Sequence, residues 1–110
     1  MGSEVFRDRL AEIGREVGEN AWAMPLLEEH DEELKSQAAD IRNIHVKREG
    51  GMEFAGTYLS QFVGEGIEWA HIDIAGPSWN GSAPRGYTPK RATGVPVRTV
   101  VAVLREIAES

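Results

Sequence analysis

Two chemically useful side chains, His71 and Asp73, stand two positions apart inside the apolar run WAHIDIA at residues 69–75. If this run is a strand, both side chains project from the same face. Asp73 then lies toward the carboxyl end of the strand, where open α/β sheets place their ligands. A His-x-Asp pair can supply two ligands to a zinc or manganese ion. Two ligands do not complete a site, so the alternative is that both are buried polar groups satisfied by neighbouring hydrogen bonds.

The elements that must position these residues follow from apolar periodicity. Apolar residues at helical spacing predict about four helices, and alternating or apolar runs predict two or three short strands. The expected helices cover residues 3–17, 28–37, 52–62 and 96–108, and the candidate strands cover 69–75, 21–24 and the ambiguous segment 38–46. The 69–75 strand is apolar on both faces apart from its two polar residues, which predicts a central position in a sheet. Alternation of helices and strands indicates the α/β class.

The segment between the central strand and the last helix, residues 76–94, is rich in Gly, Pro, Ser and Asn. It is long for a connection inside a compact domain, and such loops are usually functional or mobile.

Composition restricts the function classes. A chain of 110 residues is the size of one domain, so residues 1–110 are expected to form a single unit. The net charge of -6 argues against nucleic-acid or anionic-membrane partners, because phosphate binding needs clustered cations. No apolar run approaches the roughly 20 residues of a membrane helix. The chain has no cysteine, nucleophile elbow, phosphate loop or dinucleotide-binding glycine motif. We therefore expect a soluble cytoplasmic protein without a complete catalytic set of its own.

Four blocks of the sequence carry a resemblance to the leucyl (cytosol) aminopeptidases. WAHIDIAG at residues 69–76 closely resembles the family's WAHLDIAG segment, and GENAWAMPL at 18–26 is similar to its GE-x-x-W-x-x-P-L stretch. ADIRNI at 39–44 is similar to AD-x-x-N-I, and ATGVPVR at 92–98 is similar to A-T-G-x-x-V-R. The blocks occur in family order and spacing, so the match is specific.

This resemblance implies the C-terminal part of a two-metal aminopeptidase, using zinc, manganese or magnesium, that releases N-terminal residues from peptides. It implies a mixed sheet sandwiched between helices and assembly into a homo-oligomer, commonly a hexamer. The family's metal ligands come from a lysine, two aspartates and an Asn-Thr-Asp-Ala-Glu-Gly-Arg stretch that also supplies a catalytic arginine. None of these occurs in this sequence, since all lie upstream of the matched region. The 110-residue chain is therefore expected to bind no metal and to be inactive alone.

The family's substrate-pocket wall maps onto Ile44, Ala75 and Ser78. At the position of Ser78 relatives can carry a larger apolar residue such as methionine, and Arg91 stands where the family has glycine. By this resemblance His71 and Asp73 become structural polar groups at the strand end.

Two other interpretations remain open from the sequence. The chain could be a non-catalytic interaction or assembly module derived from the same fold, or a small metal-binding protein that uses His71 and Asp73. A piece of a larger sheet is also expected to expose apolar surface and to self-associate.

Overall fold

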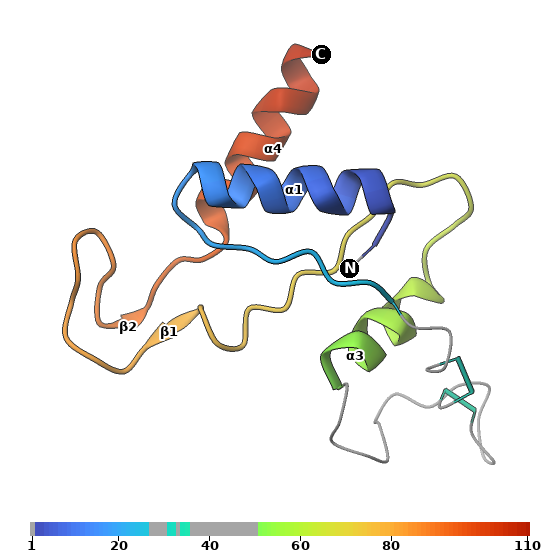
Figure 1. Ribbon diagram of the computed structural model, residues 1–110, viewed down its shortest axis with the longest axis horizontal. Coiled ribbons are helices and arrows are strands. Elements are labelled where there is room, and N and C mark those ends of the chain that lie inside the picture. Colours follow the sequence, from blue (N-terminus) through green and yellow to red (C-terminus); the bar gives the residue numbers. More distant parts are fainter. Residues whose placement is uncertain (1, 27–30, 33, 36–50) are drawn as a thin grey trace. The chain divides into compact units, whose positions relative to one another are not determined.

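The computed structural model describes residues 2–26, 31–32, 34–35 and 51–110 (Figure 1). Its helices and strands are α1 (Glu4–Glu16), α3 (Gly51–Ser60), β1 (Trp79–Asn80), β2 (Arg91–Ala92) and α4 (Val97–Glu109). The described residues thus form a mixed α/β structure of three helices and one two-stranded sheet, slightly fewer elements than expected. The expected helix at 28–37 and the segment at 38–46 fall largely or wholly outside the described residues. None of the described helices is long and apolar enough to cross a membrane.

The chain divides into two compact units. Unit 1 combines Met1–Asp8 with Ala23–Ile72, and unit 2 combines Arg9–Trp22 with Asp73–Ser110. The expectation of a single domain remains a prediction. The predicted wall residues Ala75 and Ser78 belong to unit 2, as does α4.

In unit 1, α3 confirms the predicted helix, and only part of its apolar surface is buried. Phe54 and Thr57 are 3% exposed, whereas Leu59 and, just after the helix, Phe62 are 43% and 67% exposed. The Thr57 hydroxyl donates to the Glu53 carbonyl at 2.9 Å, which satisfies this buried polar group within the helix. Helical periodicity therefore located the helix, and tertiary packing selected the face that is buried.

The predicted central strand at 69–75 is wrong for the described residues. Within residues 69–75 the structure has one isolated bridge, between Ala70 and Gly2. Beside it the Ser3 amide donates to the Trp69 carbonyl at 3.0 Å, and the Ser3 hydroxyl accepts from the Trp69 amide at 3.2 Å. A strand is defined by ladder bonds to neighbouring strands, and here the ladder stops after this pair.

The short strand expected at 21–24 is also wrong, because residues 19–26 have no regular secondary structure. Trp22, within this segment, is 84% exposed. The residue before Pro25 is disfavoured from the helical region, and no ladder to another strand forms here.

In unit 2, the end of α1 is shaped by two glycines. Gly14 is buried, and a β-carbon there would approach the Glu19 carbonyl to 2.8 Å and the Thr99 hydroxyl to 3.4 Å. Gly18 has φ 85°, the left-handed conformation that ends many helices. The Glu19 amide then donates back to the Gly14 carbonyl at 2.8 Å. Both glycines let the chain turn sharply over the end of α1.

The start of α4 is capped by a residue far away in the sequence. Its N-cap residue, Pro96, provides no side-chain hydrogen bond. One carboxylate oxygen of Glu19 instead accepts from the Thr99 amide at 2.8 Å and from the Thr99 hydroxyl at 2.6 Å. A negative charge at this end also complements the helix dipole.

The long segment 76–94 contains a hairpin that the sequence did not predict. β1 and β2 pair antiparallel, with Trp79 opposite Ala92 and Asn80 opposite Arg91. The Asn80 side-chain amide donates to the Ala83 and Pro89 carbonyls at 3.2 and 3.1 Å, which holds the loop between the strands.

Candidate functional site

The predicted wall residues Ala75 and Ser78 lie in one tight turn, residues 74–78, which we call the wall turn. The Ser78 amide donates to the Ile74 carbonyl at 3.0 Å. The Asp73 carboxylate accepts from the Ala75 amide at 2.9 Å. Ala75 is exposed and Ser78 is half-buried. The turn therefore presents a methyl group and a small hydroxyl side chain, while Ile44, the third predicted wall residue, lies outside the described residues.

Asp73 has a structural role at this turn. Its carboxylate is exposed, so the expectation of a buried group is wrong, although the expected backbone hydrogen bond is present. A carboxylate that bonds the amide two residues ahead stabilises a turn. His71 is half-buried.

The described residues do not fit a metal centre. Across residues 2–26, 31–32, 34–35 and 51–110, no three His, Cys, Asp or Glu side chains are grouped so that they could hold a metal ion.

A residue that the sequence analysis did not single out, Thr93, fastens the wall turn to the hairpin. Its amide donates to the Ser78 carbonyl at 2.9 Å, and its hydroxyl donates to the Pro77 carbonyl at 2.5 Å. The same hydroxyl accepts from the Val95 amide at 3.3 Å. Membership of the ATG run was the only sequence signal that could have pointed to this residue.

A second contact set holds the hairpin loop of unit 2 against the end of α1. The Tyr87 hydroxyl donates to the Gly18 carbonyl at 3.2 Å, and Arg98 donates to the Val17 carbonyl at 3.2 Å. The Arg98 guanidinium also lies 3.5 Å from the centre of the Tyr87 ring, a cation–π contact. These bonds satisfy carbonyls at the helix end, where intrahelical partners are missing.

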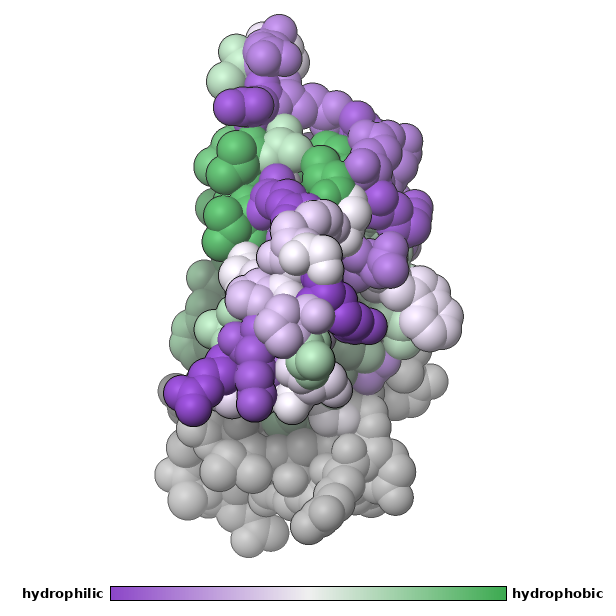
Figure 2. Space-filling model, turned by 90° about the vertical axis from the view of Figure 1, so that its left-hand side faces the viewer, coloured by the Kyte–Doolittle hydropathy of each residue, from purple (hydrophilic) through white to green (hydrophobic). Residues whose placement is uncertain are grey.

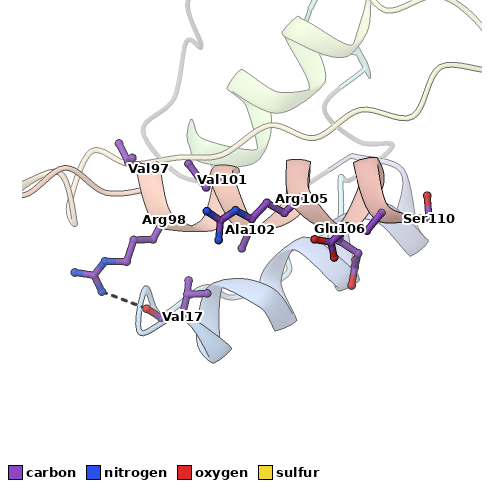
Figure 3. Close-up of a pocket in the computed structure, with 9 residues that line it drawn as sticks. Val17, Val97, Arg98, Val101, Ala102, Arg105, Glu106 and Ser110 are labelled. Atoms are coloured by element: carbon purple, nitrogen blue, oxygen red, sulfur yellow. Dashed lines mark hydrogen bonds between the residues drawn. The ribbon is translucent and has the colours of Figure 1, made fainter.

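An open groove of about 870 Å³ runs along α4 beside Val17 (Figure 3). Figure 3 shows Arg98 reaching across to the Val17 carbonyl, while Arg105 and Glu106 project from the following turns of the helix. Val101 and Ala102 supply apolar lining. The groove thus combines apolar lining with charged residues of both signs.

The apolar stripe of α4 is largely exposed. Thr99 and Val103 are 3% and 7% exposed, whereas Val97 and Leu104 are 61% and 59% exposed. Figure 2 shows hydrophobic side chains gathered in the upper half of its face, at the height of α4 in Figure 1. We call the exposed part the α4 apolar face, made of Val97, Val100, Val101, Leu104 and Ile107.

Charge pairs join α1 to α4 at the groove, through Glu106 of its lining. The Arg9 guanidinium donates to the Glu106 carboxylate at 3.0 Å and also pairs with Glu12 at 2.9 Å and Glu16 at 3.5 Å. The hydrogen bond from Arg9 holds the pKa of Glu106 below its usual value, and the same bond raises the pKa of Arg9. These groups are solvent-exposed, so the network fixes orientation more than it adds stability.

Comparison with known proteins shows a consistent match. The sequence model of the cytosol aminopeptidase family, catalytic domain, matches residues 1–101. A protein of Corynebacterium efficiens named "Probable cytosol aminopeptidase" is 64% identical over 109 residues, which cover 99% of this chain and 22% of that protein.

Two solved structures also match this chain. The bottromycin maturation enzyme BotP in complex with Mn matches 96% of this chain and 23% of its own, with 31% identity and a TM-score of 0.89. A mutant of tomato leucine aminopeptidase matches 94% of this chain and 19% of its own, with 36% identity and a TM-score of 0.78. This chain thus spans about a fifth of the length of these relatives, and it belongs to the cytosol aminopeptidase family, as a portion of the catalytic domain.

Proposed function

We propose that residues 1–110 contribute one wall of the substrate pocket and an assembly surface to a metal-dependent aminopeptidase that releases N-terminal amino acids from peptides. The observation that supports the proposal is the family match, together with the wall turn, which carries two of the small residues that the resemblance assigns to the pocket wall. The parent enzyme would act in the cytoplasm as a homo-oligomer, a hexamer by family resemblance, without nucleic-acid or membrane partners.

The metal chemistry belongs, in this proposal, to parts of the catalytic domain outside this chain. Two divalent ions, zinc or manganese, would supply the nucleophilic hydroxide and polarise the peptide carbonyl. The described residues do not fit these ions, and we assign no catalytic step to them. The isolated chain is therefore proposed to be inactive.

The wall turn acts by shape. Ala75 and Ser78 present little volume, which leaves room for the side chain of the substrate's N-terminal residue. A difference of one methylene in an apolar pocket changes discrimination by about 10–200-fold. The size of the residue at position 78 is thus proposed to set which N-terminal side chains are accepted.

The α4 apolar face is proposed to pack against the rest of the catalytic domain. Contiguous apolar surface of this kind marks an interaction site, and about four-fifths of the matched relatives' length lies outside the alignment with this chain. In the isolated chain the same face should instead drive self-association.

The function is tested with a chimaera in which residues 1–110 follow the upstream part of the Corynebacterium efficiens relative. We expect it to hydrolyse leucine amide with added manganese or zinc, while the isolated 110-residue chain does not. Ser78→Met in the chimaera should shift the preference between leucine and alanine amides, and Ser82→Met, in the hairpin loop, is the matched control. Metal-dependent hydrolysis by the isolated chain would overturn the assignment of the metal chemistry, and a folded but inactive chimaera would overturn the proposed function.

The role of the α4 apolar face in association is tested separately by light scattering of the isolated chain. Leu104→Ser should lower the apparent mass toward that of a monomer. Ile67→Ser is the control, because Ile67 is 58% exposed, close to the 59% of Leu104, but lies outside α4. Equal effects of the two substitutions would contradict a specific role of the α4 apolar face.

A further inference from the structure

We infer that Thr93 is a positioning residue for substrate selection: it holds the wall turn in the shape that sets which N-terminal side chains fit. The inference rests on the proposed function, because it assigns a consequence to the wall of that same pocket. Thr93 itself is not placed in contact with substrate and acts through the turn.

The hydrogen bonds of Thr93 continue the hairpin ladder into the wall turn. β1 and β2 pair Trp79 with Ala92, so the next pair in the register is Ser78 with Thr93. The bond from the Thr93 amide to the Ser78 carbonyl, at 2.9 Å, extends the ladder by this one step. The position of Ser78 is therefore coupled to the register of the hairpin.

The Thr93 hydroxyl adds a hydrogen bond one residue beyond this step of the ladder, at Pro77. It donates to the Pro77 carbonyl at 2.5 Å and accepts from the Val95 amide at 3.3 Å. Pro77 has no N–H of its own, so this carbonyl is the backbone group through which position 77 can be held. One side chain thus joins the middle of the wall turn to the segment that leads into α4.

The wall turn depends on these bonds because it has little packing. Ala75, Gly76 and Pro77 are all exposed, and Asp73 holds the turn from its other end. Removing the Thr93 hydroxyl frees the Pro77 carbonyl and leaves the Val95 amide without its acceptor. The turn then samples other shapes, which changes the pocket wall without touching groups that carry the chemistry.

The test compares Thr93→Val, which removes the hydroxyl at nearly constant shape, with Thr93→Ser, which keeps it, in the chimaera described above. A hydrogen bond contributes about 1 kcal/mol, which corresponds to roughly fivefold in an equilibrium. We expect Thr93→Val to change the ratio of kcat/KM for leucine amide to that for alanine amide by about fivefold, through KM, with kcat nearly unchanged. Thr93→Ser should restore the parent ratio, and Thr88→Val is the matched control on the hairpin loop.

Hydrogen exchange on the same proteins tests the hydrogen bonds of the Thr93 hydroxyl independently of enzyme activity. The Val95 amide should exchange faster in Thr93→Val and at the parent rate in Thr93→Ser. An unchanged selectivity ratio in a folded Thr93→Val variant overturns the inference, as does failure of Thr93→Ser to rescue. If the unmutated chimaera is inactive, the proposed function fails and the role of Thr93 in selectivity fails with it. Unchanged exchange of the Val95 amide in Thr93→Val would instead refute the hydrogen-bonding role of the Thr93 hydroxyl. Thr93→Ala provides the same comparison if the valine variant does not fold.

Discussion

Replacing Glu19 by alanine removes the carboxylate that caps the start of α4 from a position 80 residues away in the sequence. One oxygen of this carboxylate accepts from both the amide and the hydroxyl of Thr99, at 2.8 and 2.6 Å. Thr99 is 3% exposed, so water does not readily replace the lost acceptor. Two buried donors are left unpaired at a helix start whose own N-cap residue, Pro96, offers no side-chain bond.

The cost follows from these contacts. Each hydrogen bond to a charged group contributes about 1.5–3 kcal/mol, and loss of a helix cap typically costs about 1 kcal/mol. Because both donors share one oxygen, we expect Glu19→Ala to lower the free energy of unfolding by about 2–3 kcal/mol. For a chain of this size that corresponds to a fall in Tm of about 10 °C or more. Glu19→Gln keeps an acceptor but loses the charge, so about 1 kcal/mol is expected.

Urea unfolding followed by circular dichroism measures these differences. Glu16→Ala is the matched control, since its side chain is 56% exposed and pairs with Arg9 at 3.5 Å; its effect should stay within about 0.5 kcal/mol. Hydrogen exchange at the Thr99 amide reports the local effect. If Glu19→Ala is no more destabilising than Glu16→Ala, the capping argument is refuted.

Three further outcomes are expected. Asp73→Ala should lower the free energy of unfolding by about 1 kcal/mol, because an exposed turn bond to the Ala75 amide is lost; a parent-like urea midpoint would contradict this. Arg91→Gly should raise the free energy of unfolding by about 1 kcal/mol, since Arg91 has φ 74°, a conformation that is strained for arginine and not for glycine; a lower Tm would count against it. Glu106→Gln should lower the free energy of unfolding above pH 4.5, because the bond to Arg9 needs the ionised carboxylate. This effect should disappear as the pH falls through the lowered folded-state pKa of Glu106. A Tm difference that does not depend on pH would exclude this linkage.

Local signals in the sequence predicted the helices well. α1, α3 and α4 follow from apolar periodicity because helix bonds join residues four positions apart. The same periodicity did not say which face is covered: Leu104 belongs to the apolar stripe and is 59% exposed. Burial depends on what packs against the helix, which the period of one helix does not contain.

The strands were predicted poorly because strand pairing is not local. The apolar run at 69–75 has strand composition, but the described chain offers it only the pairing with Gly2 and Ser3. The β1–β2 hairpin was missed because each strand has two residues and the loop is fixed by the side chain of Asn80 rather than by alternation.

At the candidate site, too, the sequence indicated some residues, while the roles of others depended on contacts between distant parts of the chain. Ala75 and Ser78 came from family resemblance and remain predicted pocket residues. Glu19 and Thr93 lie inside resembling blocks, yet their roles became visible only from hydrogen bonds to residues distant in the chain. Arg91 is the reverse case: the glycine expected from the family acquires a physical reason in its φ of 74°.

The cap on α4 also has a consequence for synthesis on the ribosome. Glu19 and Thr99 are 80 positions apart, and chains grow at about 5–20 residues per second. Roughly 4–16 seconds therefore pass between the appearance of Glu19 and that of its partner. During this interval the end of α1 lacks its α4 contacts and is open to the α4 of a neighbouring nascent chain. Slower translation before residue 97 should for this reason increase exchange of α4 between copies.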